Sequence, residues 1–175
     1  MNLFLWGALP YIAFTFLIVG TLVRFFYFER NWTTKSSEFL EKKQLRIANP
    51  LFHFGLLCVI GGHVVGVLIP KTWTAAIGIN DHMYHQGALY MGAVAGLIFI
   101  VGFLLLMKRR FTVAELKVNT SRLDKWLYLF LTLAIFSGMA GTLLNASGFF
   151  DYRVSIGPWF RSLLAFMPDP SLMEG

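Results

Sequence analysis

Residues 49–70 read NPLFHFGLLCVIGGHVVGVLIP, and this stretch, which contains no Asp, Glu, Lys or Arg, decides the fold. The run Leu51–Ile69 has about the 20 residues that a helix needs to cross the hydrocarbon core of a bilayer. Asn49 followed by Pro50 is typical of a helix start, because the Asn side chain can cap the first turn and the missing proline N–H is not needed there. The stretch predicts a membrane span that ends at Pro70.

Three further uncharged stretches have a similar length. In chain order they are Leu3–Val23, Gly87–Met107 and Trp126–Ala146. The chain of 175 residues is 57% hydrophobic and 14% charged, whereas soluble domains are about 25% charged. We therefore expect an all-α fold, a polytopic transmembrane helix bundle with four spans in a single domain over residues 1–175. The tail 147–175 mixes aromatic residues with Asp and Arg, which predicts an interfacial helix or a packed loop.

The basic residues are distributed unevenly between the connections. Of the 15 Lys and Arg residues, all but three lie in segments 24–46 and 108–125; the exceptions are Lys71, Arg153 and Arg161. The positive-inside rule therefore predicts an N-terminus outside and two basic loops in the cytoplasm. This bias explains the net charge of +6 without a nucleic-acid partner. The single cysteine, Cys58, lies inside a span, which excludes a disulfide framework and a thiolate metal site.

Two histidines lie inside the second span, where an ionisable side chain is costly and indicates a functional site. His53 and His63 are ten residues apart, which in a helix is about 15 Å of rise and about 80° of rotation. One metal ion cannot bind both side chains, whereas two stacked metal centres can. Neutral imidazole is a good axial ligand for haem iron, and small neighbours would let a porphyrin approach. Such neighbours are Gly55, Gly61, Gly62 and Gly66. We predict haem ligation, with structural histidines as the alternative.

The other two histidines, His82 and His85, precede the third span and share one face if that segment is helical. Three interpretations stay open for them: solvated interfacial residues, part of a quinol site, or alternative ligands to the outer haem or another metal. A quinol hydroxyl needs a hydrogen-bond acceptor that also takes its proton, which suits histidine. The candidate quinol site comprises Gly62, His63, His82 and His85. The run Lys108–Arg110 is either a topological stop or a partner for haem propionates.

The chain resembles the gamma subunit of membrane-bound respiratory nitrate reductase, which is the haem b subunit of that enzyme. The resemblance rests on NPLFH at 49–53, GGHVVG at 61–66, LLLMKRR at 104–110 and PYIA at 10–13, and it extends over essentially the whole chain. It implies five spans and two b-type haems, with His53 on the inner iron and His63 on the outer iron. In the family, the second histidine of each haem lies on the fifth span. We therefore expect the chain as given to be truncated before that span and to lack the second axial ligands.

The resemblance also implies a mechanism. Membrane quinol, with menaquinol expected if the source is Gram-positive, would be oxidised near the outer face. Its electrons would pass through both haems to an iron–sulfur subunit on the cytoplasmic side. They would then reach a molybdenum subunit that reduces nitrate, so the nitrate-reducing site would not lie in this chain. The protein would be an enzyme subunit in the bacterial cell membrane.

Two other classes of protein compete with this interpretation. A haem b membrane anchor of a different quinone-linked reductase complex would share every feature except the soluble partners. A non-haem membrane scaffold or transport component explains the hydropathy but leaves His53 and His63 unexplained. A transporter would also need broken helices or a charged pathway at mid-membrane, and the predicted spans contain no charged residue.

Overall fold

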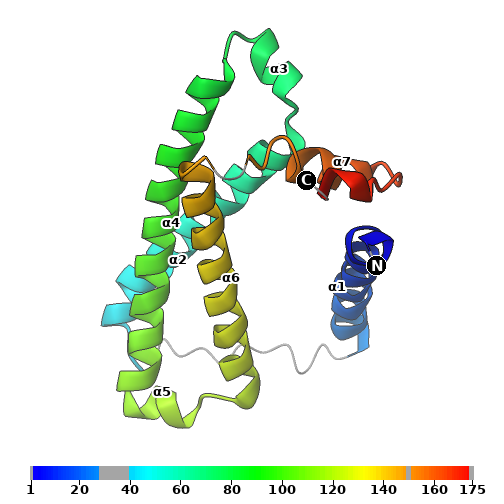
Figure 1. Ribbon diagram of the computed structural model, residues 1–175. Helices are drawn as coiled ribbons and strands as arrows, with labels where there is room; N and C mark the ends of the chain where they lie inside the picture. The colour runs from blue at the N-terminus through cyan, green and yellow to red at the C-terminus, as the bar shows by residue number, and fades with distance from the viewer. Residues whose placement is uncertain (1, 28–39, 149–150, 174–175) are drawn as a thin grey trace. The chain divides into compact units, whose positions relative to one another are not determined.

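The computed structural model describes residues 2–27, 40–148 and 151–173, and the regular structure within these ranges is helical, without a strand (Figure 1). Four of the described helices are long and apolar enough to cross a membrane. They are Phe4–Tyr27, Lys43–Leu68, Asp81–Thr112 and Arg122–Ala146. The predicted all-α fold with four spans is therefore confirmed. The chain forms two compact units, Met1–Ser36 with Tyr152–Gly175, and Ser37–Asp151.

The described residues of the second unit form three long helices and two short ones. They are α2 (Lys43–Leu68), α3 (Lys71–Ala76), α4 (Asp81–Thr112), α5 (Ala114–Val118) and α6 (Arg122–Ala146). In Figure 1, α3 occupies the turn between α2 and α4, and α5 the turn between α4 and α6. Local capping fixes two of the starts. The side chain of Asn80 accepts the N–H of Met83 at the start of α4, and Ser121 forms a reciprocal capping box with Asp124 at the start of α6.

Helix α2 begins earlier than the sequence suggests. Its first residue is Lys43, and Pro50 lies inside the helix, so the predicted start at Asn49 and Pro50 is wrong. An interior proline gives up one helical hydrogen bond, because it has no N–H. The first turn of α2 is nevertheless secured by the carboxylate of Glu41, which accepts the N–H of Gln44 at 2.7 Å. Packing before the proline also offsets the lost hydrogen bond, since Ala48 is fully buried.

Helices α2 and α4 approach each other backbone to backbone at one crossing. A Cβ atom added to Gly55 would lie 2.6 Å from the Cα of Phe99, and one added to Gly102 would lie 2.6 Å from the Cα of Phe52. Neither distance is possible for a real Cβ, so only glycine permits this approach. The ring of Phe52 fills the space beside the crossing and lies 5.2 Å from the Phe99 ring and 6.4 Å from the Phe103 ring, between centroids. Gly62, further along α2, has no atom within 4 Å of its Cβ position among the described residues.

The first unit begins with a π-helical turn, Phe4–Ala8, that leads into α1 (Leu9–Tyr27). Pro10 is the second residue of α1, directly after this turn. Pro10 has no N–H to donate to the carbonyl of Trp6, four residues before it. That carbonyl accepts instead the indole N–H of Trp159 at 2.8 Å. The proline therefore creates the acceptor that joins the two ends of this unit.

The described residues of the tail contain one α-helix, α7 (Ile156–Leu164), and a short 3-10 helix, Pro170–Met173. Helix α7 packs on the start of the first unit through aromatic side chains. The Trp6 and Trp159 rings meet edge to face with centroids 5.6 Å apart, and the hydroxyl of Tyr11 donates to the carbonyl of Leu163 at 2.8 Å. The sequence predicts an interfacial helix or a packed loop for the tail, and residues 156–164 of it are helical.

Candidate functional site

Both predicted haem ligands lie on α2, and both side chains are exposed. The Nδ1 atom of His53 lies 2.9 Å from the carbonyl oxygen of Asn49, and the Nδ1 atom of His63 lies 2.7 Å from the carbonyl oxygen of Val59. A carbonyl oxygen only accepts hydrogen bonds, so each Nδ1 carries the proton and donates it. In the neutral imidazole the lone pair is then on Nε2, and no group in the described ranges bonds to that atom.

The helix itself produces this arrangement. A side chain four residues beyond a backbone carbonyl lies on the same face and can bond back to it. Both histidines make this same bond, so both present the same nitrogen outward. An imidazole whose Nδ1–H is held by a carbonyl has a fixed tautomer and ring orientation and a more basic Nε2, which is the usual arrangement of a metal-ligating histidine.

The imidazole of His53 also makes a contact with a neighbouring ring. The Phe52 and His53 ring centroids lie 5.2 Å apart, with the planes at 84°. His53 projects from α2 about 160° away from Gly55, at 100° per residue, so it lies on the side opposite the crossing with α4. His63 lies about 15 Å further along the helix, at 1.5 Å per residue. The two histidines therefore belong to two separate sites.

The residues around these histidines fit a haem. Across the described ranges, no three His, Cys, Asp or Glu side chains gather where they could hold a metal ion. A haem needs no such group, because the macrocycle supplies four nitrogen ligands and the protein supplies only axial ones. Beside His63, the Cβ positions of Gly61 and Gly62 have no atom within 4 Å, which leaves room for a flat ring. The exposed surface between the histidines is apolar, with Leu57 68% exposed.

The four residues of the predicted quinol site are not brought into one cavity. His82 and His85 lie in the first two turns of α4, where His82 is exposed and His85 is half-buried. An open apolar pocket of about 350 Å³ lies where α2, α3 and α4 meet, with the lining residues Trp73 and Ile77 exposed. Its lining consists of Val65, Ile69, Trp73, Thr74, Ile77, Ile79 and Tyr84. None of Gly62, His63, His82 and His85 lines it, although Tyr84 lies between the last two.

Most of this lining was not predicted from the sequence. Pro70 ends α2 and the chain turns directly into α3, which begins at Lys71. The signal that could have indicated the pocket was Trp73, an aromatic residue in a short connection between two spans. The ammonium group of Lys71 holds the connection in place, since it lies 2.9 Å from a carboxylate oxygen of Asp151 and 3.7 Å from one of Asp81.

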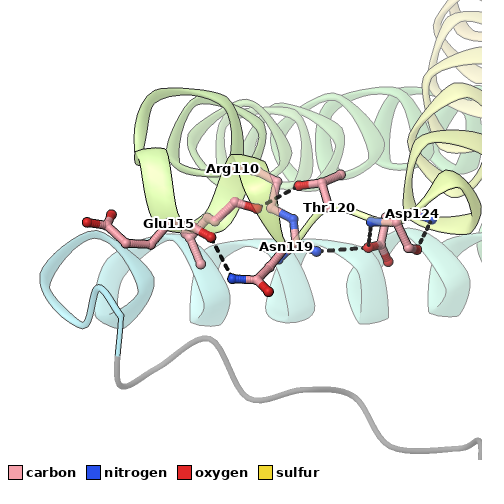
Figure 2. A network of polar contacts seen from close by, with 7 residues as sticks. Arg110, Glu115, Asn119, Thr120 and Asp124 are labelled. Carbon is pink, nitrogen blue, oxygen red and sulfur yellow. Dashed lines mark hydrogen bonds and ion pairs between the residues drawn. The ribbon is translucent and has the colours of Figure 1, made fainter.

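The basic run at the end of α4 is engaged by carboxylates of this chain. The guanidinium of Arg109 donates through Nε to Glu41 at 2.7 Å, and the guanidinium of Arg110 donates to Asp124 at 2.9 Å. Figure 2 shows the second pair, next to the hydrogen bond from the Asn119 side chain to the carbonyl of Glu115. The proposed role of this run as a partner for haem propionates is thereby weakened for both arginines. Their pairs instead tie the end of α4 to the starts of α2 and α6.

Arg109 is the most buried of the charged side chains in this region. It is 3% exposed, and besides its ion pair with Glu41 it donates to the backbone carbonyl of the same residue. A buried guanidinium is tolerated only when its donors are satisfied. The hydrogen bond from Gln44 N–H lowers the pKa of the Glu41 carboxyl below its ordinary value of 4.5, and the guanidinium of Arg109 lowers it further. Glu41 therefore stays ionised at neutral pH.

We predict that this pair stabilises the protein at neutral pH and not in acid. Because the folded pKa of Glu41 is below the unfolded one, its contribution is fully present above about pH 5 and is lost as the pH falls through the lowered value. The measurement is the melting temperature of the detergent-solubilised protein and of its Glu41→Gln variant from neutral to acid pH. The difference between the two should be constant at neutral pH and shrink in acid. A difference that grows on acidification would contradict the assignment.

The fold and the site define a class of protein: a multi-span membrane protein with two histidines on one span, each with its Nδ1 atom bonded to a backbone carbonyl. The family can then be stated, because the model of the nitrate reductase gamma subunit family matches residues 2–175. The chain belongs to this family. Membership confirms the resemblance seen in the sequence, and it makes the chain a nitrate reductase subunit of the gamma type, part of an oxidoreductase complex.

Three curated relatives show how far the similarity extends. The nitrate reductase gamma chain of Bacillus subtilis (strain 168) is 46% identical over 171 residues, which cover 97% of this chain and 77% of the relative. The nitrate reductase-like protein NarX of Mycobacterium tuberculosis (strain H37Rv) is 39% identical over 171 residues, 96% of this chain but only 26% of that protein. The respiratory nitrate reductase 1 gamma chain of Escherichia coli (strain K12) is 30% identical over 124 residues, 71% of this chain and 55% of the relative.

Proposed function

We propose that the protein is the haem b electron-transfer subunit of a respiratory nitrate reductase. It would oxidise membrane quinol and pass the electrons through two haems to an iron–sulfur subunit, and from there to a molybdenum subunit that reduces nitrate. The observation that carries the proposal is the matched pair His53 and His63, each with Nδ1–H bonded to a backbone carbonyl and Nε2 exposed. Membership in the gamma subunit family supports it.

The distribution of basic residues supports one orientation of the chain in the membrane. With segments 24–46 and 108–125 in the cytoplasm, as the positive-inside rule requires, His53 would lie at the cytoplasmic end of α2 and His63 at the outer end. Electrons would then enter near His63 and leave near His53. The exposed basic residues Lys42, Lys43 and Arg46, at the start of α2, would face the soluble subunits. The protein would reside in the bacterial cell membrane.

The residues of this chain would have defined roles. When bound, each haem supplies one-electron redox chemistry. His53 and His63 would each hold one haem iron through Nε2, with the tautomer and orientation of the ring set by the carbonyl of Asn49 or Val59.

Quinol oxidation would occur at the His63 end of the molecule. Each quinol gives up two electrons and two protons as it becomes quinone. The pocket at the junction of α2, α3 and α4 has about 350 Å³, which is within the usual range for a small-molecule site, and its apolar lining suits a quinol ring. His82 and His85 flank Tyr84 of this lining in the sequence and would accept the released protons, because an imidazole nitrogen can accept a hydrogen bond and take the proton. Gly62 would leave room beside His63.

The test is a dithionite-reduced minus oxidised visible spectrum of the complex, purified from membranes through a tag on this subunit, with haem quantified per chain. We expect two b-type haems per gamma subunit, both reduced when a quinol is added in place of dithionite. A folded subunit without haem would contradict the proposal and favour a scaffold or transport component. Haem that dithionite reduces and quinol does not would contradict the quinol-oxidising role.

A further inference from the structure

Phe52 connects a candidate haem ligand to a neighbouring helix through its ring. On one side its ring meets the His53 imidazole edge to face, with centroids 5.2 Å apart and planes at 84°. On the other side it packs against two rings of α4, Phe99 at 5.2 Å and Phe103 at 6.4 Å. Phe99 and Phe103 are both buried, at 8% and 6% exposure. The imidazole of His53 therefore contacts a ring that itself packs in the buried core between α2 and α4.

The crossing of α2 and α4 places this ring. Only a glycine at position 102 lets the backbone of Phe52 come as close as it does, because a Cβ there would lie 2.6 Å from the Phe52 Cα. On α2, Gly55 makes the matching approach to the backbone of Phe99. The ring of Phe52 is thus held by contacts on α4 that lie outside its own helix, and its position does not depend on α2 alone.

The orientation of the His53 ring is therefore fixed at two points. The first is the hydrogen bond from Nδ1–H to the carbonyl of Asn49, which leaves the ring able to tilt about that bond. The second is the contact with Phe52, which opposes this tilt because edge-to-face ring pairs prefer a defined geometry. A ligating imidazole is tuned by the neighbours that orient it, and these neighbours affect both metal affinity and redox potential.

We propose that Phe52 is a positioning residue that sets the ring plane of His53 as a haem ligand, and so tunes the haem at His53 without affecting the haem at His63. The assignment rests on the proposed haem-binding function. It concerns one of the two sites, since Phe52 lies next to His53 and eleven residues, about 16 Å along the helix, from His63.

The experiment compares Phe52→Leu with the unsubstituted complex by electron paramagnetic resonance of the oxidised haems and by redox titration. The components are assigned with His53→Ala and His63→Ala variants. We expect the signal and midpoint potential of the His53 component to shift and those of the His63 component to stay. Affinity for that haem should fall about tenfold, the lower end of the effect of removing a partner that orients a ligating histidine. Phe52→Tyr, which keeps the ring, should restore the original signal.

Two further variants separate positioning from general loosening. Phe99→Leu leaves Phe52 in place but removes its support from α4, so the same component should shift in the same direction by a smaller amount. Phe111→Leu is the matched control, because it removes a comparable ring contact of α4, with Tyr128 at 6.3 Å, and does not reach His53. It should leave both components unchanged.

The results that would contradict the role of Phe52 differ from the result that would contradict haem binding itself. Two bound haems with an unmoved His53 component in Phe52→Leu and Phe99→Leu would overturn the assignment alone, as would equal shifts of both components. A shift of the same size in Phe111→Leu would also overturn it. Absence of both haems from the unsubstituted complex would overturn the proposed function, and this assignment with it.

Discussion

Replacing Gly102 by alanine should destabilise the protein strongly, although alanine favours helices by about 1 kcal/mol over glycine. The new Cβ would lie 2.6 Å from the Cα of Phe52, against the backbone of α2. A backbone cannot move aside as the end of a side chain can, so the two helices must separate. Overpacking of a core typically costs about 1–3 kcal/mol and occasionally more, and we expect a value at the upper end. The melting temperature of the detergent-solubilised protein measures it.

Gly96 provides the matched control for this prediction. It lies on the same helix six residues earlier, and nothing lies within 4 Å of its Cβ position. Gly96→Ala should therefore leave the melting temperature unchanged or raise it, through helix propensity alone. The same chemical change should thus have opposite effects at two positions of one helix. If Gly102→Ala and Gly96→Ala behaved alike, the close crossing of α2 and α4 would be wrong.

His63→Ala and His53→Ala should each remove one of the two haems and leave the other. The two sites are about 15 Å apart on α2, and each histidine has its own carbonyl partner, so neither can substitute for the other. Haem per gamma subunit, measured by the reduced minus oxidised spectrum, should fall by about half in each variant, because losing the axial ligand removes the protein's bond to that iron.

The two variants should differ in what quinol can still do. In His53→Ala, quinol should still reduce the remaining haem, while electron delivery to nitrate stops. In His63→Ala, reduction by quinol should itself be slow. His82→Ala is the control for haem content and should retain both haems, because its role is proposed for the quinol site. Unchanged haem content in both alanine variants at 53 and 63 would falsify the assignment of the ligands.

The candidate site could be predicted in part from the sequence. The interval between His53 and His63 is fixed by helix geometry once the segment is known to be helical, and a charge-free run of this length leaves little alternative to a helix. The carbonyl partners of both rings also follow from a spacing of four residues. The pocket could not be predicted, because its lining comes from α3 and from the ends of α2 and α4, whose relative placement is not written in any local pattern.

The start of α2 shows the same limit. Asn49 and Pro50 form a valid local signal for a helix start, yet the helix begins at Lys43. The segment before the proline is held by contacts from another helix, since Arg109 of α4 binds Glu41 and Glu41 caps the first turn. The Asn–Pro signal describes where an isolated segment would begin a helix. The tertiary contacts of Glu41 outweigh this local preference.

The sequence by itself determined that the protein has four membrane-spanning helices, that their connections carry an asymmetric charge, and that two histidines lie at two depths of one span. Each of these properties depends on residues near one another in the chain, through hydropathy and the helical repeat. The tertiary structure decided which glycines matter: Gly55 and Gly102 meet a neighbouring backbone, whereas Gly61 and Gly62 do not. It also decided that the rings of Phe99 and Phe103 support Phe52 beside His53. These contacts join residues about 50 positions apart in the sequence, and only the packing of one helix on another brings such residues together.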